Sequence, residues 1–387
     1  MDKASLIRFA QELVQKPSLS CQEGDVARRA EGEMRALGYD EVHTDPFGNV
    51  VGVIEGTGEG PTLLLDAHTD TVDVKGAVPW GRDPFSGDVA DGFLHGRGSA
   101  DMKGALAAMI HGAASVDRDR LRGRVVMCAS PMEEVLEGVA LREVMEEYRP
   151  DFVVIGEATD LGIARGGRGR AEIHLEATGI PTHSSAPHLG RNAVLEMMKV
   201  VGQLEDVPLP VDPVMGPAIL ALTEMVSAPY PANSVIPSIC RATYDRRLIP
   251  GETVEDVLEP IKVAARADGV ELKAEVGIGE YTTFTGKTLR KEKFFPAWLF
   301  PEDDWFVERA LAGLERRGLE RKVGAYRFCT NAAYSAGEAG VPTVGFGPAK
   351  ETDAHLVDER LSLTDLEAAA EGYAGIIESA LATIDRT

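Results

Sequence analysis

The chain has 387 residues, and its 40 basic and 62 acidic residues give a formal net charge of −22. With 44% hydrophobic and 26% charged residues, the composition is typical of a folded globular protein rather than a disordered one, and the length favours two domains. Because so acidic a chain repels nucleic acid and anionic membranes, we expect neither as a partner.

The N-terminal segment and the cysteines indicate in which cellular compartment the protein is expected. Arg8 and Glu12 interrupt the continuous apolar core that a signal peptide needs, and no apolar run approaches the ~20 residues of a membrane span. The four cysteines lie far apart and form no C-x-x-C pair, and Cys128 stands within an apolar run, as a small buried thiol would. We therefore predict a soluble protein of the reducing cytoplasm.

The first half of the chain alternates short apolar runs with amphipathic segments. The pattern predicts strands over 62–67, 125–129 and 152–155, with a later one over 343–346, and helices over 104–114 and 139–148. This alternation predicts an α/β fold in which a mixed, mostly parallel sheet lies between helices.

The pattern changes after about residue 170. Segments 171–178 and 241–248 alternate apolar and polar residues, as half-exposed antiparallel strands do, and helices are predicted over 191–204 and 253–267. We predict a smaller α+β domain, residues 172–284, inserted into a catalytic domain formed by 1–171 and 285–387. The Pro-rich stretch 207–217 is expected to be a loop of the insert, and helices over 305–317 and from about 363 complete the larger domain.

Potential metal ligands follow the predicted strands, one strand after another. They are His68 and Asp70, then the pair Glu133 and Glu134, then Glu157, and finally His355. In an open α/β sheet, ligand sites form at the carboxyl ends of the strands. Repetition of such residues at successive strand ends therefore points to a metal site.

Each of these residues also has an ordinary structural interpretation. His68 could be a structural histidine, Glu157 and His355 could be surface residues, and Asp101 could cap a helix that begins near Met102. These interpretations are plausible singly and implausible jointly. Asp70 lies on the same side of an extended segment as His68, where it could accept the second imidazole N–H.

Other catalytic signatures are missing from the sequence. The loop H-G-R-G-S-A-D-M-K-G lacks the spacing of a phosphate-binding loop, and Asp101 would repel a phosphate. There is no G-x-S-x-G and no H-E-x-x-H motif. Histidines combined with carboxylates suit zinc or a similar first-row metal, and the available ligands suffice for two ions if one carboxylate bridges them. A carboxylate that is not itself a ligand could then act as the base, but the residues alone leave open which of Glu133 and Glu134 has that role.

These motifs resemble the family of cocatalytic-zinc amidohydrolases that includes acetylornithine deacetylase, succinyl-diaminopimelate desuccinylase, carboxypeptidase G and aminoacylase. The matching stretches are L-L-L-D-A-H-T-D-T-V, H-G-R-G-S-A-D-M-K-G, P-M-E-E, I-G-E-A-T and D-A-H-L-V-D-E-R. The segment 330–348 is most similar to a subgroup labelled selenium-metabolism hydrolases. Two positions depart from the usual pattern, namely Ala67, where Gly is frequent, and Arg360, where a bulky aromatic is frequent.

The resemblance implies a role for each residue of the site. Asp101 would bridge two metal ions, His68 and Glu157 would hold one ion, and Glu134 and His355 would hold the other. Asp70 would orient His68, and Glu133 would be the general base. The family often has a cis peptide after its bridging aspartate, here Asp101–Met102.

The predicted insert resembles the family's lid. In P-T-H-S-S-A-P-H-L-G-R-N-A-V, His183 would reach the active site of a partner subunit and stabilise the oxyanion; the alternative is a polar turn in which Ser185 caps the following helix. In Y-D-R-R-L-I-P-G, Arg247 rather than Arg246 would bind the substrate carboxylate. Asn233 occupies a lid position that often contacts substrate. The alternative for both is ordinary polarity at strand ends.

We therefore predict a metal-dependent hydrolase, a homodimer through the lid, that uses two divalent ions to cleave the amide of an N-acyl amino acid or short peptide. Zinc is the expected metal, with cobalt and manganese as alternatives. A di- or aminopeptidase or a carboxypeptidase of the same family is the alternative activity. A non-catalytic binding or assembly relative is the alternative of another class, and the presence of all five ligands and Glu133 argues against it.

Overall fold

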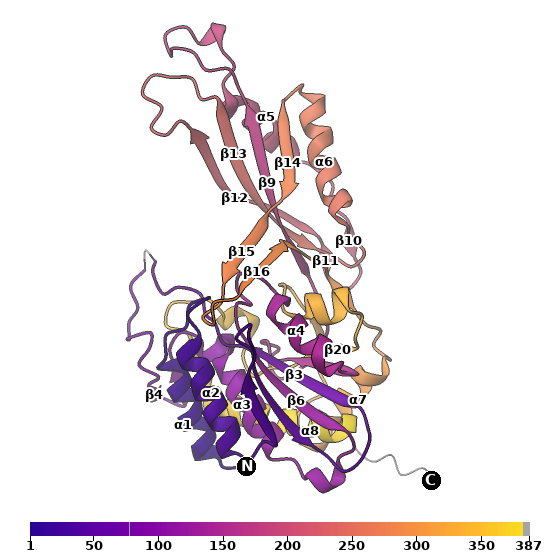
Figure 1. Ribbon diagram of the computed structural model, residues 1–387. Coiled ribbons are helices and arrows are strands. Elements are labelled where there is room, and N and C mark those ends of the chain that lie inside the picture. Colours follow the sequence, from indigo (N-terminus) through magenta and orange to yellow (C-terminus); the bar gives the residue numbers. More distant parts are fainter. Residues whose placement is uncertain (77, 382–387) are drawn as a thin grey trace.

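The computed structural model describes residues 1–76 and 78–381 and has two lobes (Figure 1). The larger lobe contains the N-terminus and the last helix, and the smaller lobe is formed mainly by the middle of the chain. We keep 172–284 as the proposed extent of the inserted domain. Strand β9 (Gly169–Thr178) crosses the first proposed boundary, and residues 382–387 of the second catalytic segment lie outside the described residues.

A mixed sheet forms the centre of the larger lobe. Within the described residues it has nine strands, and β19 (Val323–Tyr326) pairs with β8 beside the main path. The main path runs β1 (Glu41–Thr44), β2 (Val50–Glu55), β6 (Arg124–Ser130), β3 (Thr62–His68), β7 (Phe152–Ile155), β20 (Thr343–Gly345), β8 (Ile163–Gly167) and β18 (Trp298–Leu299). The central strands β6, β3, β7 and β20 are parallel to one another, and the flanking pairs are antiparallel. The predicted α/β class is confirmed.

Helices cover both faces of this sheet. Alternate residues of β3 enter different cores, with Leu63 and Leu65 on one face and Leu64 on the other. The first face packs against α1 (Lys3–Val14), α2 (Gly24–Ala36), α3 (Gly104–Ala114), α7 (Trp305–Arg316) and α8 (Leu363–Leu381). The second face packs against α4 (Val139–Tyr148) and the π-helical turn η4 (Ala333–Glu338). Because both faces are covered, central strands such as T-L-L-L-D-A-H are buried along their whole length.

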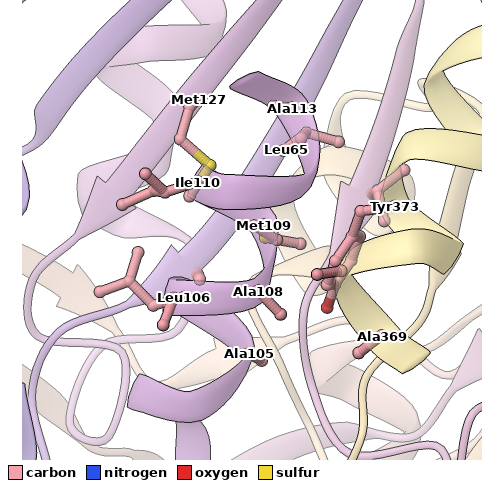
Figure 2. Packing of buried hydrophobic residues seen from close by; sticks show 14 of the residues in the cluster. Leu65, Ala105, Leu106, Ala108, Met109, Ile110, Ala113, Met127, Ala369 and Tyr373 are labelled. Atoms are coloured by element: carbon pink, nitrogen blue, oxygen red, sulfur yellow. The ribbon is translucent and has the colours of Figure 1, made fainter. Parts of the chain in front are cut away.

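Helix α3 is buried on all sides between the sheet and α8. Figure 2 shows Leu65 and Met127 of the sheet on one side of α3 and Ala369 and Tyr373 of α8 on the other. The segment was expected to be amphipathic, but its residues are buried on every side, including His111, which bonds to Glu33 at 2.8 Å. At Gly112 a Cβ atom would lie 2.5 Å from the carbonyl oxygen of Ala370, so only glycine allows the two helices to approach this closely.

The smaller lobe has its own sheet and core. Strands β12 (Ile219–Ala228), β13 (Ile239–Leu248), β9 and β14 (Leu272–Val276) are antiparallel, and β17 (Phe294–Phe295) also pairs with β9. Helices α5 (Ala193–Leu204) and α6 (Val254–Ala267) cover one face, where alternate residues of β9 are buried. The predicted loop 207–217 contains a short pairing of β10 (Val211–Asp212) with β11 (Gly216–Pro217).

A hairpin and a small three-stranded sheet lie outside the two main sheets. The hairpin of β15 (Ile278–Thr282) and β16 (Thr288–Glu292) extends from the smaller lobe, and Phe284 at its turn packs against the core of the larger lobe. A three-stranded sheet joins β4 (Val89–Ala90), β5 (Phe93–His95) and β21 (Arg360–Ser362). Among the described helices, none has the length and apolar character that crossing a membrane requires.

Two valines, one in α7 and one in α6, test how much the core between α7 and α8 contributes to stability. Val307 of α7 is fully buried, whereas Val263 of α6 is 51% exposed. We expect Val307→Ala to lower the free energy of unfolding by about 2 kcal/mol, because two methyl groups leave a packed site. Val263→Ala should change it by less than about 0.5 kcal/mol. Urea unfolding followed by circular dichroism measures both, and equal effects would contradict the packing described.

Candidate metal centre

Three parallel strands deliver the first group of side chains to one edge of the sheet. His68 is the last residue of β3 and lies opposite Ser130, the last residue of β6. Glu133 and Glu134 follow β6, and Glu157 follows β7. Ligand atoms of His68, Glu133 and Glu157 lie within 4.8 Å of one another. The structure therefore brings together the residues that the strand ends were expected to supply.

The carboxylate of Asp101 lies between the two histidines. Its Oδ1 is 3.0 Å from Nε2 of His68, and its Oδ2 is 3.1 Å from Nε2 of His355. Each histidine also faces a second carboxylate: Nε2 of His68 is 3.4 Å from Oε1 of Glu157, and Nε2 of His355 is 3.1 Å from Oε1 of Glu134. One carboxylate with each oxygen directed at a different imidazole is the arrangement of a bridging ligand.

Asp101 is not a helix cap. It lies in the π-helical turn η1 (Ser99–Lys103), and α3 begins only at Gly104. In the described chain, neither turn nor helix has a side-chain hydrogen bond at its N-cap, so the capping interpretation is wrong. The peptide bond Asp101–Met102 is cis, as the resemblance implies.

His68 and Asp70 are arranged somewhat differently from the expectation. Nδ1 of His68 lies 2.9 Å from the main-chain oxygen of Asp70 and 3.5 Å from its carboxylate oxygen Oδ1. A proton on Nδ1 leaves the lone pair of Nε2 directed at the other carboxylates, as metal binding requires. The main-chain oxygen is thus the nearer acceptor.

The Asp70 carboxylate instead holds the turn that carries the paired glutamates. It accepts hydrogen bonds from the main-chain N–H groups of Glu133 (3.1 Å) and Glu134 (3.2 Å) and from the hydroxyl of Ser20 (2.6 Å). Asp70 therefore links the segment of His68 to that of both glutamates.

Burial and mutual repulsion dominate the electrostatics of this cluster. Burial raises the pKa of Glu133 well above its usual value; His68 opposes the shift, and the neighbouring carboxylates add to it. Burial, with Asp101 beside it, raises the pKa of Glu157 to about 7. Hydrogen bonds to Asp101 and Glu134 raise the pKa of His355 to about 10. The cluster therefore concentrates negative charge that a bound cation would neutralise.

The donor set fits the expected metal. Two imidazole nitrogens and several carboxylates suit zinc or a similar first-row ion better than calcium, which takes oxygen ligands alone. His68, Asp101, Glu134, Glu157 and His355 converge closely enough to hold two ions with Asp101 between them.

A cavity of about 360 Å³ opens beside the cluster. Its walls include Asp101, the paired glutamates, Glu157 and His355 from the larger lobe, and Arg170 and Arg247 from β9 and β13. Nε of Arg247 is 2.8 Å from Oδ1 of Asp245. Arg246 is 4% exposed, bonds to Glu252, and lines a different cavity. Arg247, rather than Arg246, therefore lines the cavity beside the cluster.

His183 and Asn233 lie elsewhere. Both are exposed, in the loops that follow β9 and precede β13, at the ends of these strands opposite to Arg170 and Arg247, and the main chain of His183 pairs with that of Val235. Among the described residues lining the cavity, neither is present. Nδ1 of His183 accepts the N–H of Ser185 at 3.1 Å, which leaves the proton on Nε2, free to donate. The cap of α5 is Asn192, so the alternative role for Ser185 is wrong.

Several residues of the site were missed in the sequence. Glu137 and Arg170 line the cavity and form an ion pair of 2.7 Å, and Arg170 lies directly opposite Arg247 across β9 and β13. In the sequence, the one signal that could have identified Glu137 as a residue of the site was its position four residues after Glu133. Arg360, the departure from the family pattern, has its guanidinium over the ring of Phe93 at 4.3 Å.

Comparison with known proteins identifies the family. The family model described as Peptidase family M20/M25/M40 matches residues 64–379. The chain belongs to this family. Membership confirms the resemblance and places the chain among hydrolases of amide and peptide bonds.

Related sequences span nearly the whole chain. An Escherichia coli K12 protein, named only as uncharacterized protein YgeY, is 34% identical over 98% of this chain and 96% of its own length. The succinyl-diaminopimelate desuccinylase of Cereibacter sphaeroides ATCC 17025 is 28% identical over 96% of this chain and 98% of its own.

Solved structures share the fold. A tripeptidase from Staphylococcus aureus aligns with a TM-score of 0.77 at 20% identity over 98% of both chains. The YXEP protein of Bacillus subtilis, described as a dinuclear metal binding peptidase, aligns with a TM-score of 0.70 at 16% identity over 97% of both. At these identities the similarity establishes the fold.

Glu23 bonds to the turn that carries Glu133 and Glu134, and its pKa leads to a prediction about pH. Its Oε1 accepts the N–H groups of Cys21 and Met132, and its Oε2 has no partner among the described residues. Burial, with Asp70 nearby, raises the pKa of Glu23 to about 7. A raised carboxyl pKa contributes stability below the unfolded value of about 4.5, and this stability is lost as the pH rises through 7.

We therefore expect Glu23→Gln, which keeps the accepting oxygen, to stabilise the metal-free protein at pH 8 by up to about 3 kcal/mol. The gain should shrink towards pH 5. Urea midpoints across this range measure it, with the exposed Glu59→Gln as the control that should show no such trend. A gain independent of pH would contradict the titration of Glu23.

Proposed function

We propose that this chain is a dinuclear metal-dependent amidohydrolase that cleaves the amide bond of N-acyl amino acids. The observation that carries the proposal is the carboxylate of Asp101, whose two oxygens face two histidines, each paired with a further carboxylate. One ion would be held by His68 and Glu157, the other by Glu134 and His355, with Asp101 shared. Zinc is the proposed metal, with cobalt or manganese as alternatives.

Metal ions bound there would act as Lewis acids that polarise the amide carbonyl and lower the pKa of water. Glu133 is the general base. Its carboxylate lies in the cluster with His68 and Glu157, and burial raises its pKa, which makes it a stronger base than an exposed glutamate. Water adds to the carbonyl carbon, the C–N bond breaks, and Glu133 passes the proton of the water to the leaving nitrogen.

The substrate is proposed to carry a carboxylate. Arg247 lines the cavity, and a guanidinium matches a carboxylate in geometry and charge. The desuccinylase relative, which covers almost the whole chain, supports a deacylase. A di-, amino- or carboxypeptidase remains the second candidate, which the name of the family supports.

Assembly through the smaller lobe is part of the proposal. Strand β12 is an edge strand, and Leu222, Met225 and Val226 on it are between 37% and 46% exposed. Leu195 and Met198 of α5, in the same lobe, are each 56% exposed. An exposed edge of ten residues with apolar side chains favours pairing with a second copy. We propose a homodimer in which His183 of each chain serves the site of the other and donates to the oxyanion, and Asn233 contacts substrate.

The reaction can be tested with one isosteric variant. Purified protein should bind divalent metal and hydrolyse members of a panel of N-acyl amino acids and dipeptides. Glu133→Gln removes the base but keeps the shape of the side chain, so we expect turnover to fall by at least about 100-fold while metal content stays near that of the wild type. Metal analysis and product assays measure the two effects separately.

The matched control is Glu146→Gln, a glutamate on α4 that is 63% exposed and should keep full activity. Turnover near the wild-type level in Glu133→Gln would exclude Glu133 as the base. Absence of metal, or of hydrolysis across the panel, would contradict the proposed function itself.

The shared site can be tested by mixing two inactive variants. We expect His183→Ala to lower turnover by roughly 100-fold, because one donor to the oxyanion is lost. A mixed dimer with Glu133→Gln contains one site with both Glu133 and His183. Equal mixing after subunit exchange should therefore restore about a quarter of the sites.

His188→Ala, an exposed histidine five residues further along the same loop, is the control and should stay active. No recovery of activity on mixing, although mixed dimers form, would show that His183 does not act across an interface.

A further inference from the structure

A buried ion pair lies behind the candidate metal centre. Oε2 of Glu359 is 2.6 Å from Nη1 of Arg97, and their side chains are 0% and 5% exposed. Removing two charges from water costs more than such a pair usually returns, so stability alone does not account for it. Its contacts with the metal-ligand segments offer another reason.

Glu359 holds the main chain of the proposed bridging residue. Its Oε1 accepts the N–H groups of Ala100 (2.8 Å) and Asp101 (3.1 Å). Its own main-chain oxygen accepts the N–H of Gly96 at 2.9 Å. Next to it Arg360 pairs with His95, where β21 meets β5. Glu359 is therefore the point at which segments 93–101 and 355–362 are joined.

The five proposed ligands thus come from two structural units. His68, Glu134 and Glu157 follow the parallel strands β3, β6 and β7, and Asp70 joins the first two of these segments. Asp101 and His355 belong instead to the two segments that Glu359 joins. His355 stands four residues before Glu359, and about half of its side chain is exposed, while its Nε2 faces both Asp101 and Glu134.

We propose that Glu359, paired with Arg97, is a positioning residue that holds Asp101 and His355 as one unit against the sheet edge. The inference rests on the proposed dinuclear site. Each proposed ion has two ligands of its own and shares Asp101. The ion held by His68 and Glu157 would keep two of its three ligands on the sheet edge, whereas the ion held by Glu134 and His355 would keep only one. Loss of Glu359 therefore weakens the second position first.

Metal titration of the metal-free protein tests this proposal without any assay of activity. Calorimetry with Zn²⁺ should show two binding steps in the wild type. In Glu359→Gln the amide cannot serve both Arg97 and the two N–H groups, so we expect one step to weaken by roughly 10- to 100-fold and the other to stay near its wild-type affinity. The weakened step should be the one that is lost in His355→Ala and retained in Glu157→Ala.

The neighbouring Asp358→Asn is the matched control. Its side chain bonds to the N–H of Gly81 rather than to a ligand segment, and both steps should stay unchanged. Arg97→Gln, which leaves the Glu359 carboxylate on the two N–H groups, should weaken the same step to a smaller degree and provides the test if Glu359→Gln does not fold. Circular dichroism and thermal midpoints of the metal-free proteins verify folding.

Three results would overturn the proposal. Two steps of wild-type affinity in Glu359→Gln would show that the pair does not position the ligands. Equal weakening of both steps would show that it supports the whole site without distinction. A wild-type protein that binds fewer than two ions would remove the proposed dinuclear site together with this inference, so the two failures are distinguishable.

Discussion

The carboxylate of Asp101 stands between two histidines that are 287 positions apart in the sequence, His68 and His355. Most other features of the site follow from the charge gathered around it. Glu133, Glu134 and Glu157 crowd the same edge of the sheet, and burial raises the pKa of each. Like charges taken out of water repel strongly, so the cluster calls for cations. The proposed pair of divalent ions would neutralise this charge, and the cluster offers ligand types that zinc prefers.

Buried carboxylates that accept main-chain N–H groups keep the loops of the site in place. Asp70 accepts from the paired glutamates, Glu23 from the residue before them, and Glu359 from the bridging aspartate. A loop has no ladder of its own to satisfy its N–H groups, so a side-chain acceptor both satisfies and fixes it. Acidic residues would therefore serve the proposed site in two ways, as ligands and as the framework that orients them.

The two lobes contribute different residues to the proposed site. The larger lobe supplies every proposed metal ligand and the base, and the smaller contributes Arg247 to the cavity. His183 follows β9 at the end of that strand opposite to Arg170, and it is not among the described residues that line the cavity of its own chain. A second copy joined through the exposed edge of β12 would explain both the apolar residues of that edge and the position of His183.

Local patterns in the sequence determined the elements and the ligand types. The apolar run of β3 and the alternation in β9 follow from burial on two faces and on one face, and each was predictable from its neighbours in the chain. The placement of ligands at strand ends was predictable for the same reason, since parallel strands end at one edge. Helix α3 was expected to be amphipathic, and only its packing between the sheet and α8 decided that it is buried on all sides. Only the tertiary structure decided that Glu137, Arg170 and Glu359 belong to the site. Glu137 and Arg170 pair with each other, and Glu359 pairs with Arg97 and accepts the N–H of Asp101, in each case across a long stretch of sequence. The tertiary structure also decided that His183 stands outside the described lining of the cavity of its own chain, because the direction in which the smaller lobe extends depends on packing that no local pattern records.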